Sequence, residues 1–347
     1  MPFAVMPEVA QFYGADWSNF LRTESNHTPA SAQRRARADP EIGFFFFCRE
    51  YLDLGSKGQF NAGDAVFFSG EPWPGSAPQC DLYRKRAMTT GYVEVNANNP
   101  ANIGCFSLQD GQPLFDFACI FAANIGVGPD GKALLTFNPQ VDAVLNRSDV
   151  VARLQDQGVS VLLSVLNNWQ NAGWSCFTEY SQAEAFADQL AQCVNRYRLD
   201  GIDIDDEYSS CALQPDSLIM AAHAMNRAMP GKIVTKALWS DHSYFQRSWN
   251  GITLAQTLTY GWEMSYDGDI RVLTPYVDAG MRPAQLLLGI NSPTDPRQAF
   301  DLSAQIAAQG FGGIMVFSVT TQSAALLSGI SGGLYNQHTL VAPDCLS

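Results

Sequence analysis

From residue 89 onward, short β-rich runs alternate with stretches in which apolar residues recur at helical spacing. Several runs are nearly continuous in apolar residues, as expected for strands whose two faces are both covered. Repetition of a strand and a helix is typical of a parallel sheet. The predicted strands span residues 89–98, 115–125, 159–168, 201–208, 232–240, 258–268, 285–291 and 312–319.

Amphipathic stretches separate several of these runs, and the clearest predicted helices span residues 140–158, 181–199, 215–231 and 296–310. Eight strand–helix repeats over about 250 residues match the size of a TIM barrel. The predicted fold is therefore an α/β (β/α)8 TIM barrel with an N-terminal appendage. An open doubly wound sheet is the structural alternative, but no Gly-rich phosphate-binding motif follows the early strands.

Residues 1–88 lack this alternation, and we assign them to an appendage of unknown role, with the barrel spanning 89–347. They contain a basic helix-like piece, a phenylalanine run, a hairpin-like segment and a Pro/Gly linker, at residues 31–40, 43–48, 63–70 and 71–79. The RRAR tetrapeptide at 34–37 could be a processing site or an anionic-ligand site, but its single turn of charge favours an ordinary solvated helix face.

Charge and hydropathy exclude several classes of partner. A formal net charge of −13 and a pI near 4.6 disfavour nucleic acid and an anionic membrane surface as partners. No apolar run approaches the roughly 18 residues that a membrane helix needs. We therefore expect no nucleic-acid and no membrane partner.

The eight cysteines show none of the close pairs or His–Cys groups that mark zinc sites, so we expect no metal and no cofactor. Cys119 and Cys193 fall in predicted strand and helix interiors and are interpreted as small buried hydrophobes. Cys176 and Cys211 both follow predicted strands and could face each other across one rim of the barrel.

The sequence DGIDIDDE at 200–207 concentrates acids at the end of the fourth predicted strand. Strand side chains alternate between faces, so Asp203, Asp205 and Glu207 share the side that points into the barrel. Neighbouring carboxyl groups then lie about 6.6 to 7 Å apart and repel by about 2.5 kcal/mol at an effective dielectric of about 20. We expect Asp203 and Asp205 to share a proton, and Glu207 to have a raised pKa that suits a general acid. A calcium loop is disfavoured because the alternating isoleucines indicate a strand.

Residues 200–207 also match the DGxDxDxE signature of glycoside hydrolase family 18. Further blocks resemble the Endo H type of endo-β-N-acetylglucosaminidase in the same order and with similar spacing, at residues 91–99, 115–125, 158–173 and 199–208. The resemblance covers residues 89 to about 320 and does not extend to residues 1–88.

This resemblance implies a catalytic domain over 89–347 that cuts the GlcNAc-β1,4-GlcNAc core of asparagine-linked glycans. It implies substrate-assisted retaining catalysis, an exception to the scheme with two enzyme carboxylates. Glu207 would protonate the glycosidic oxygen and then activate water, while the sugar's 2-acetamido group forms an oxazolinium intermediate. Asp205 would accept a hydrogen bond from the acetamide N–H, and Asp203 would tune Asp205.

The resemblance also implies residues that contact substrate. The MSYD block at 264–267 is similar to a family motif, which makes Tyr266 a donor to the acetamide oxygen and Asp267 a secondary candidate. Ser164 matches a family serine expected to hydrogen-bond the inner acids. Further candidates are the aromatic platforms and rim residues Trp169, Trp239, Trp262, Asn124 and Glu263.

Some positions depart from the family pattern. Asn167 stands where Endo H-type enzymes have glycine, and the eighth predicted strand lacks the tryptophan found in many chitinases. These departures leave a chitinase, or another hydrolase of GlcNAc polymers, as one alternative. A glycan-binding lectin is the other, although such relatives typically lose the terminal acid. The expected partner is an N-glycan or glycoprotein. We expect a secreted or extracytoplasmic location, although no signal peptide is visible in residues 1–14.

Overall fold

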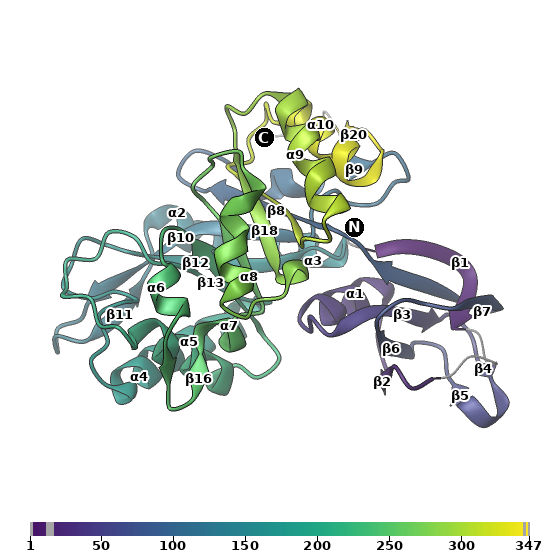
Figure 1. The fold of residues 1–347 in the computed structure, drawn as a ribbon, viewed down its shortest axis with the longest axis horizontal. Coiled ribbons are helices and arrows are strands. Elements are labelled where there is room, and N and C mark those ends of the chain that lie inside the picture. Colours follow the sequence, from purple (N-terminus) through teal and green to yellow (C-terminus); the bar gives the residue numbers. More distant parts are fainter. Residues whose placement is uncertain (1–2, 12–16, 343–344, 346–347) are drawn as a thin grey trace. The chain divides into compact units, whose positions relative to one another are not determined.

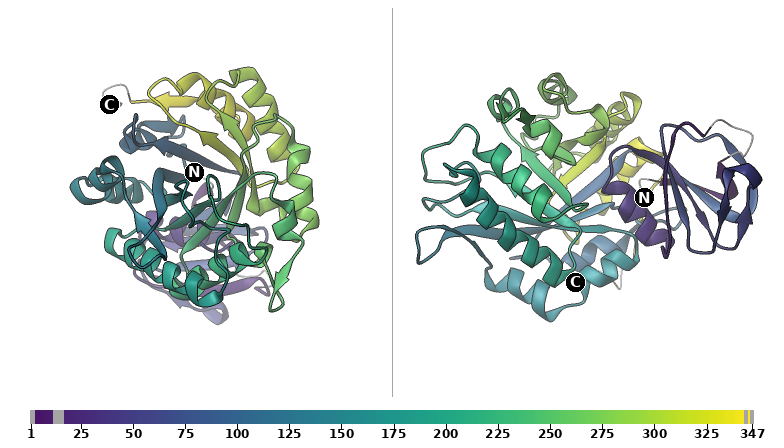
Figure 2. Two further views of the ribbon diagram at one scale, coloured as in Figure 1. Left: turned by 90° about the vertical axis from the view of Figure 1, so that its left-hand side faces the viewer. Right: turned by 90° about the horizontal axis from the view of Figure 1, so that it is seen from below.

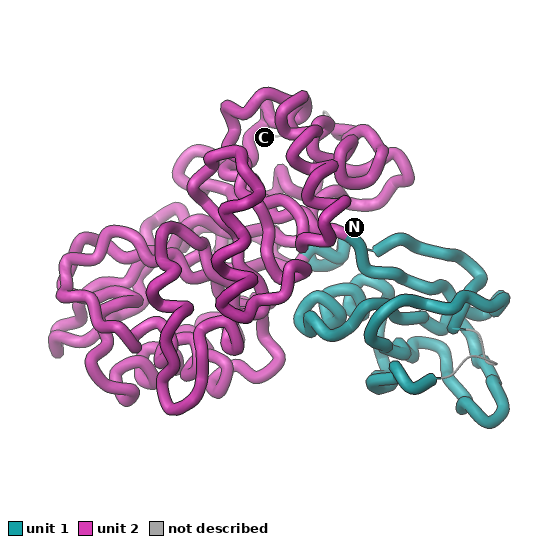
Figure 3. Tube along the Cα trace, viewed as in Figure 1, with its two compact units in different colours: residues 1–86, 155–159 teal, residues 87–154, 160–347 magenta. Residues whose placement is uncertain are grey.

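The computed structural model describes residues 3–11, 17–342 and 345. The chain divides into two compact units (Figure 3). Unit 1 comprises residues 1–86 and 155–159, and unit 2 comprises residues 87–154 and 160–347. No pattern in the sequence predicted that the short segment 155–159 would cluster with the N-terminal residues.

Unit 2 is a closed parallel barrel, which confirms the predicted fold (Figure 1). Within the described residues its eight strands are β8 (Met88–Glu94), β10 (Phe117–Val127), β12 (Ser160–Asn167), β13 (Gly201–Asp205), β14 (Ile233–Leu238), β17 (Tyr260–Glu263), β18 (Leu286–Asn291) and β19 (Gly313–Phe317). The barrel closes because β8 pairs in parallel with both β10 and β19. Each predicted strand overlaps one of these, and an antiparallel β11 (Ala133–Thr136) adds to β10.

Helices surround the barrel strands (Figure 2). They are α2 (Pro139–Arg147), α3 (Val150–Asp156), α4 (Tyr180–Tyr197), α5 (Ser217–Ala228), α6 (His242–Phe245), α7 (Leu254–Thr257), α8 (Thr274–Asp278), α9 (Pro296–Ala308) and α10 (Ala324–Tyr335). The predicted helix 140–158 is broken into α2 and α3. The break falls at Ser148, which is extended and whose hydroxyl donates to the carbonyl of Val144, so it competes with helical bonding.

Unit 1 is a five-stranded antiparallel sheet in the order β1, β7, β3, β6, β2, with α1 (Pro29–Arg37) against one face. The strands are β1 (Phe3–Gln11), β2 (Phe20–Glu24), β3 (Ile42–Cys48), β6 (Ala65–Ser69) and β7 (Pro74–Lys85). A separate two-stranded ribbon joins β4 (Leu52–Asp53) and β5 (Gln59–Phe60). The phenylalanine run forms β3, and its alternate rings enter two different hydrophobic clusters.

Two expectations for this unit were wrong. Residues 74–79 are the start of β7 and not a linker; Pro78 is tolerated because the register of β1 and β7 shifts beside it, which interrupts the ladder. The RRAR segment is not an ordinary solvated face, since Arg37 is fully buried and donates to the carbonyl of Gly158.

Two disulfides stabilise unit 2. Cys176 and Cys211 are bonded, which confirms that they face each other, and Cys105 is bonded to Cys345. Cys119 and Cys193 are free and buried, as predicted. In the described part of the chain, no helix is long and apolar enough to cross a membrane.

Candidate active site

Asp203 lies inside the barrel, where the two neighbouring strands and one non-neighbouring strand supply hydroxyl donors to its carboxylate. Strand register sets Ser164 of β12 and Thr235 of β14 directly beside it. Ser164 Oγ donates to Oδ2 at 2.9 Å and Thr235 Oγ1 donates to Oδ1 at 2.8 Å. Tyr92 of β8 donates its hydroxyl to Oδ2 at 2.5 Å. The expected hydrogen bond from Ser164 to an inner acid is therefore present.

Burial raises the pKa of Asp203 to about 6, although the three hydroxyl hydrogen bonds and the charge of Lys236 act in the opposite direction. The expected proton sharing between Asp203 and Asp205 is not observed. Both oxygens of Asp203 are occupied by hydroxyl donors, and no hydrogen bond links the two acids within the described part of the chain.

Asp205 is buried at the C-terminal end of β13 and lines a cavity. Among the described residues, its Oδ1 atom has no hydrogen-bond partner. Burial raises the pKa of this carboxyl well above its usual range, and the charges of Glu207 and Asp203 raise it further. A buried carboxyl oxygen without a partner is costly unless a ligand satisfies it, so the cavity favours a ligand with an N–H or O–H donor.

The cavity has a volume of about 310 Å³ and opens at the C-terminal ends of the barrel strands. Its lining combines acidic, phenolic and apolar side chains: Tyr92, Phe121, Leu166, Asp205, Glu207, Tyr208, Ala237, Trp239, Met264, Tyr266, Met315 and Phe317. Asp205 and Glu207 thus line one cavity.

Glu207 is half-buried and lies just beyond the end of β13. Burial raises its pKa, as expected, while the charge of Lys236 lowers it. The cause is desolvation and not the repulsion between acids on which the sequence argument rested. A carboxyl group with a raised pKa next to a cavity can act as a general acid.

Tyr266 lines the same cavity from the loop after β17, and not from the strand as predicted. Its backbone is left-handed, with φ of 58°, an uncommon conformation for a residue with a bulky side chain. Burial raises the pKa of its phenol, and the charge of Asp205 raises it further. The hydroxyl therefore keeps its proton and can donate a hydrogen bond into the cavity.

The curated proteins that this chain resembles include two endo-β-N-acetylglucosaminidases. The chain is 31% identical over 280 residues to an endo-β-N-acetylglucosaminidase from a Flavobacterium species, covering 76% of this chain and 85% of that protein. It is 30% identical over 251 residues to endo-β-N-acetylglucosaminidase F1 from Elizabethkingia meningoseptica, covering 69% and 73%. The chain belongs to the Endo H-like endo-β-N-acetylglucosaminidases of glycoside hydrolase family 18. No family model matches it.

Solved structures share the fold of this glycoside hydrolase. EndoBT-3987 from Bacteroides thetaiotaomicron, crystallised with a Man5GlcNAc product, superposes with a TM-score of 0.65 at 18% identity, covering 98% of this chain and 92% of that one. A chitinase catalytic domain from Ostrinia furnacalis gives a TM-score of 0.56 at 14% identity, covering 74% and 98%. At these identities the likeness concerns the fold.

Two proposed contact residues of the enzyme lie outside the cavity. Trp262 is fully buried and donates its Nε1 hydrogen to the Tyr92 hydroxyl, so it presents no face on which a sugar could stack. Glu263, the next residue on β17, points to the opposite side of the strand and is only 4% exposed. Its Oε1 accepts from the backbone N–H of Ser265. Its buried Oε2 has no hydrogen-bond partner among the described residues.

Of the remaining candidates, only Trp239 lines the cavity. Trp239 is 54% exposed and lines the cavity, so it stays a candidate platform. Trp169 is 70% exposed and packs on Tyr208 with ring centroids 4.8 Å apart, outside the cavity lining.

The polar candidates Asp267 and Asn124 do not line the cavity. Asp267 is exposed, and Asn124 donates a long hydrogen bond to the carbonyl of Leu166. Ser164 is fully buried and acts on Asp203, not on substrate.

Sequence reasoning missed several residues of the site. Tyr92 and Thr235 contact Asp203, but only the strand register reveals this. Lys236 is almost fully buried on β14 and forms an ion pair of 2.5 Å with Asp241. A lone lysine inside an apolar strand was a signal that could have been used, since buried lysines are rarely unpaired. Among the described residues, no group of three or more His, Cys, Asp or Glu side chains is arranged to hold a metal ion.

Proposed function

We propose that this enzyme hydrolyses the GlcNAc-β1,4-GlcNAc core of asparagine-linked glycans by substrate-assisted retaining catalysis, leaving one GlcNAc on the protein. The observation that carries the proposal is the Oδ1 atom of Asp205, which has no partner among the described residues and lies beside Glu207 and Tyr266 in one cavity. The curated relatives support the reaction, and the Man9GlcNAc2Asn substrate in a solved EndoBT-3987 complex supports the glycan class.

In the proposed first step, Glu207 donates its proton to the oxygen that links the two GlcNAc residues. The carbonyl oxygen of the 2-acetamido group attacks the anomeric carbon as the glycosidic bond breaks, and an oxazolinium ion forms. In the second step, the Glu207 carboxylate takes a proton from water, which opens the oxazolinium ring with net retention. Proton transfer of this kind contributes on the order of 10² to 10⁴ in rate.

Asp205 and Tyr266 act on the acetamide. Asp205 Oδ1 accepts from the acetamide N–H, which increases electron density on the carbonyl oxygen that attacks. The Tyr266 hydroxyl donates to that oxygen and holds it over the anomeric carbon. Both residues already line one cavity, so they need little reorganisation during the reaction.

The decisive experiment is digestion of a denatured high-mannose glycoprotein, followed by mass spectrometry, with chitin oligomers as competing substrate. We expect a mass loss that leaves one GlcNAc per site. Cleavage of chitin oligomers without change in the glycoprotein would favour the chitinase alternative, and binding without cleavage of either would favour the lectin.

Glu207→Gln should lower kcat on the order of 10³-fold while glycan affinity stays within about tenfold, because only proton transfer is lost. Glu263→Gln is the matched control: it changes a carboxyl group outside the cavity and keeps the acceptor for the Ser265 N–H. Substantial turnover by Glu207→Gln would exclude Glu207 as the acid.

We also propose that the enzyme works outside the cytoplasm. The two disulfides support this, since such bonds persist in oxidising compartments. Export can be tested by locating the natural full-length protein in cell fractions; recovery only from the cytoplasm would contradict the proposal.

A further inference from the structure

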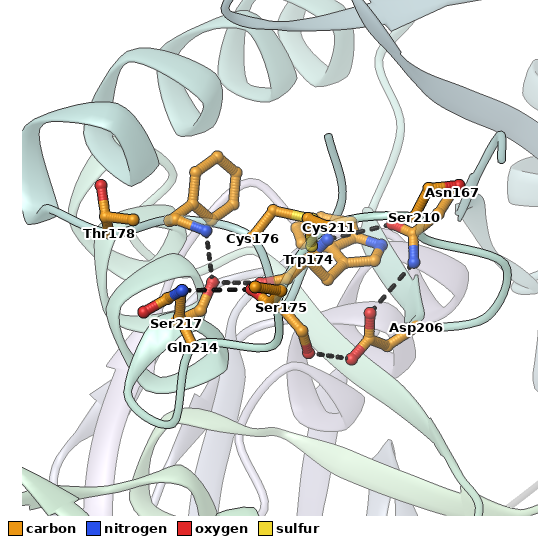
Figure 4. The surroundings of a disulfide bond; sticks show 12 residues. Asn167, Trp174, Ser175, Cys176, Thr178, Asp206, Ser210, Cys211, Gln214 and Ser217 are labelled. Atoms are coloured by element: carbon orange, nitrogen blue, oxygen red, sulfur yellow. Dashed lines mark hydrogen bonds between the residues drawn. A yellow bond between two sulfur atoms is a disulfide. The ribbon is translucent and has the colours of Figure 1, made fainter. Parts of the chain in front are cut away.

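Glu207 lies two residues beyond Asp205, the last residue of β13, so the barrel ladder itself does not fix its backbone. Its two neighbours, Asp206 and Tyr208, are nevertheless anchored to the last residue of β12 and to the loop that follows it. Asp206 Oδ1 accepts from Asn167 Nδ2 at 3.0 Å, and Asp206 Oδ2 accepts from the hydroxyl of Ser175 (Figure 4). Both oxygens of Asp206 are therefore held by side chains of one neighbouring strand and loop.

Asn167 is itself immobilised. It is 1% exposed, and its Oδ1 accepts from the backbone N–H of Trp174 at 3.0 Å. Trp174 is fully buried and donates its Nε1 hydrogen to the carbonyl of Val165 at 2.7 Å. The amide of Asn167 thus has a fixed orientation, with the nitrogen directed at Asp206 and the oxygen at the loop.

The residues after Glu207 are held in the same way. The backbone N–H of Trp169 donates to the carbonyl of Tyr208 at 2.7 Å, and the N–H of Ser210 donates to the carbonyl of Gln170 at 3.0 Å. The Cys176–Cys211 disulfide joins the two loops further out (Figure 4). Contacts on both sides of Glu207 therefore lead to the β12 loop.

We propose that Asn167, Ser175 and Asp206 form a clamp that positions Glu207 for proton donation; this rests on the proposed function. Asp206 does not line the cavity, so the clamp acts through the backbone and touches no substrate. A general acid must stand within hydrogen-bond reach of the leaving oxygen, and a displacement of about 1 Å can cost on the order of 10² in rate. Anchoring the preceding side chain at both oxygens restricts the rotation that would produce such a displacement.

The first test compares two leaving groups. The Asn167→Ala variant should lower kcat/KM for a glycopeptide by about 10- to 100-fold, because a misplaced acid protonates the sugar oxygen poorly. A 4-nitrophenyl glycoside of the same oligosaccharide releases a stable anion without protonation, so its kcat/KM should fall less than about threefold. Glycan affinity, measured by calorimetry in the Glu207→Gln background, should stay within about twofold if the clamp acts only on the acid.

The second test asks whether the hydrogen bonds at Asp206 matter. Asp206→Ala should reproduce the loss, whereas Asp206→Asn should keep most of the activity, because its carbonyl still accepts from Asn167 and its amide can donate to Ser175. Ser175→Ala, which deletes one of the two bonds, should give an intermediate loss. If Asn167→Ala fails to fold, these variants still decide the matter.

Ser210→Ala is the matched control. It removes a hydroxyl bond of 2.8 Å to the Trp169 carbonyl between the same loops, but leaves Asp206 untouched. It should keep wild-type kcat/KM. The clamp would be overturned if Asn167→Ala lowered kcat/KM equally on the glycopeptide and on the 4-nitrophenyl glycoside, or if Ser210→Ala lowered kcat/KM as much as Asn167→Ala. Either result would indicate a general loosening of the two loops. If the clamp is overturned while Glu207→Gln is inactive, the proposed function still stands. If Glu207→Gln is active, the proposed function itself is contradicted.

Discussion

At the residue scale, three acids from one short segment have three different environments. Asp203 accepts hydrogen bonds from hydroxyl donors, and Glu207 is half-buried at the mouth of the cavity. Asp205 has one buried oxygen that finds no partner in the described part of the chain. Burial raises the pKa of all three. Asp205 is thus the residue at which the site most clearly sacrifices stability for function.

Asp205→Asn should therefore stabilise the protein while slowing catalysis. A carboxyl group whose folded pKa lies above its unfolded value contributes stability below the unfolded pKa, and that contribution is lost as the pH rises through the folded pKa. Wild type should lose stability from pH 4 upward relative to Asp205→Asn. Thermal melts of both proteins from pH 4 to 8 should show a widening gap in Tm; a constant gap would mean that Asp205 is not titrating as proposed.

At the element scale, β14 carries a buried positive charge, that of Lys236, next to the acidic strand β13. Thr235 and Ala237 face the barrel interior and the cavity, so Lys236 between them points toward the helices. There it pairs with Asp241, which also accepts from the Tyr276 hydroxyl at 2.7 Å. The lysine charge lowers the pKa of the inner acids and of Glu207, and so opposes the effect of burial.

Lys236→Met should have two separable effects. Leaving Asp241 buried and unpaired should cost about 3 to 5 kcal/mol in the free energy of unfolding. The pKa of Glu207 should rise, so the alkaline limb of the pH–kcat/KM profile should move to higher pH, because the acid keeps its proton longer.

The double variant Lys236→Met/Asp241→Asn separates these effects. It removes the unpaired charge and keeps an acceptor for Tyr276, so stability should recover in part while the alkaline limb stays displaced. A limb that returned to its wild-type position along with stability would show that Lys236 acts only through folding.

At the scale of the whole molecule, the sequence predicted the barrel and its acidic strand because both depend on local periodicity. Alternation within β13 is enough to turn Asp203 and Asp205 inward. Alternation does not predict the position of Tyr266, because β17 ends at Glu263 and the loop beyond it has no periodic conformation. Trp262 and Tyr92 lie far apart in the sequence, so the hydrogen bond from the Trp262 indole to the Tyr92 hydroxyl could be seen only in the folded barrel.

The disulfides illustrate the same division between local and global organisation. Cys105–Cys345 spans 240 residues and ties the region after the first barrel strand to the end of the chain, beside the pairing of β9 (Phe106–Leu108) with β20 (Thr339–Val341). Cys176–Cys211 spans 35 residues and joins the two loops that flank Glu207. In the chain-entropy model, cross-links of these lengths contribute about 5.5 and about 4 kcal/mol, respectively.

Replacing each pair with serine should therefore separate stability from activity. Cys105→Ser/Cys345→Ser should lower Tm more, because it frees the longer loop, while the acid and its clamp stay in place. Cys176→Ser/Cys211→Ser should lower Tm less and kcat/KM more, because it loosens the loops around Glu207. Melting curves without reductant, and initial rates on the glycopeptide well below both melting temperatures, measure the two effects. If loss of the Cys105–Cys345 disulfide instead lowered kcat/KM more, the positioning of Glu207 would depend on closure of the whole barrel and not on its neighbouring loop.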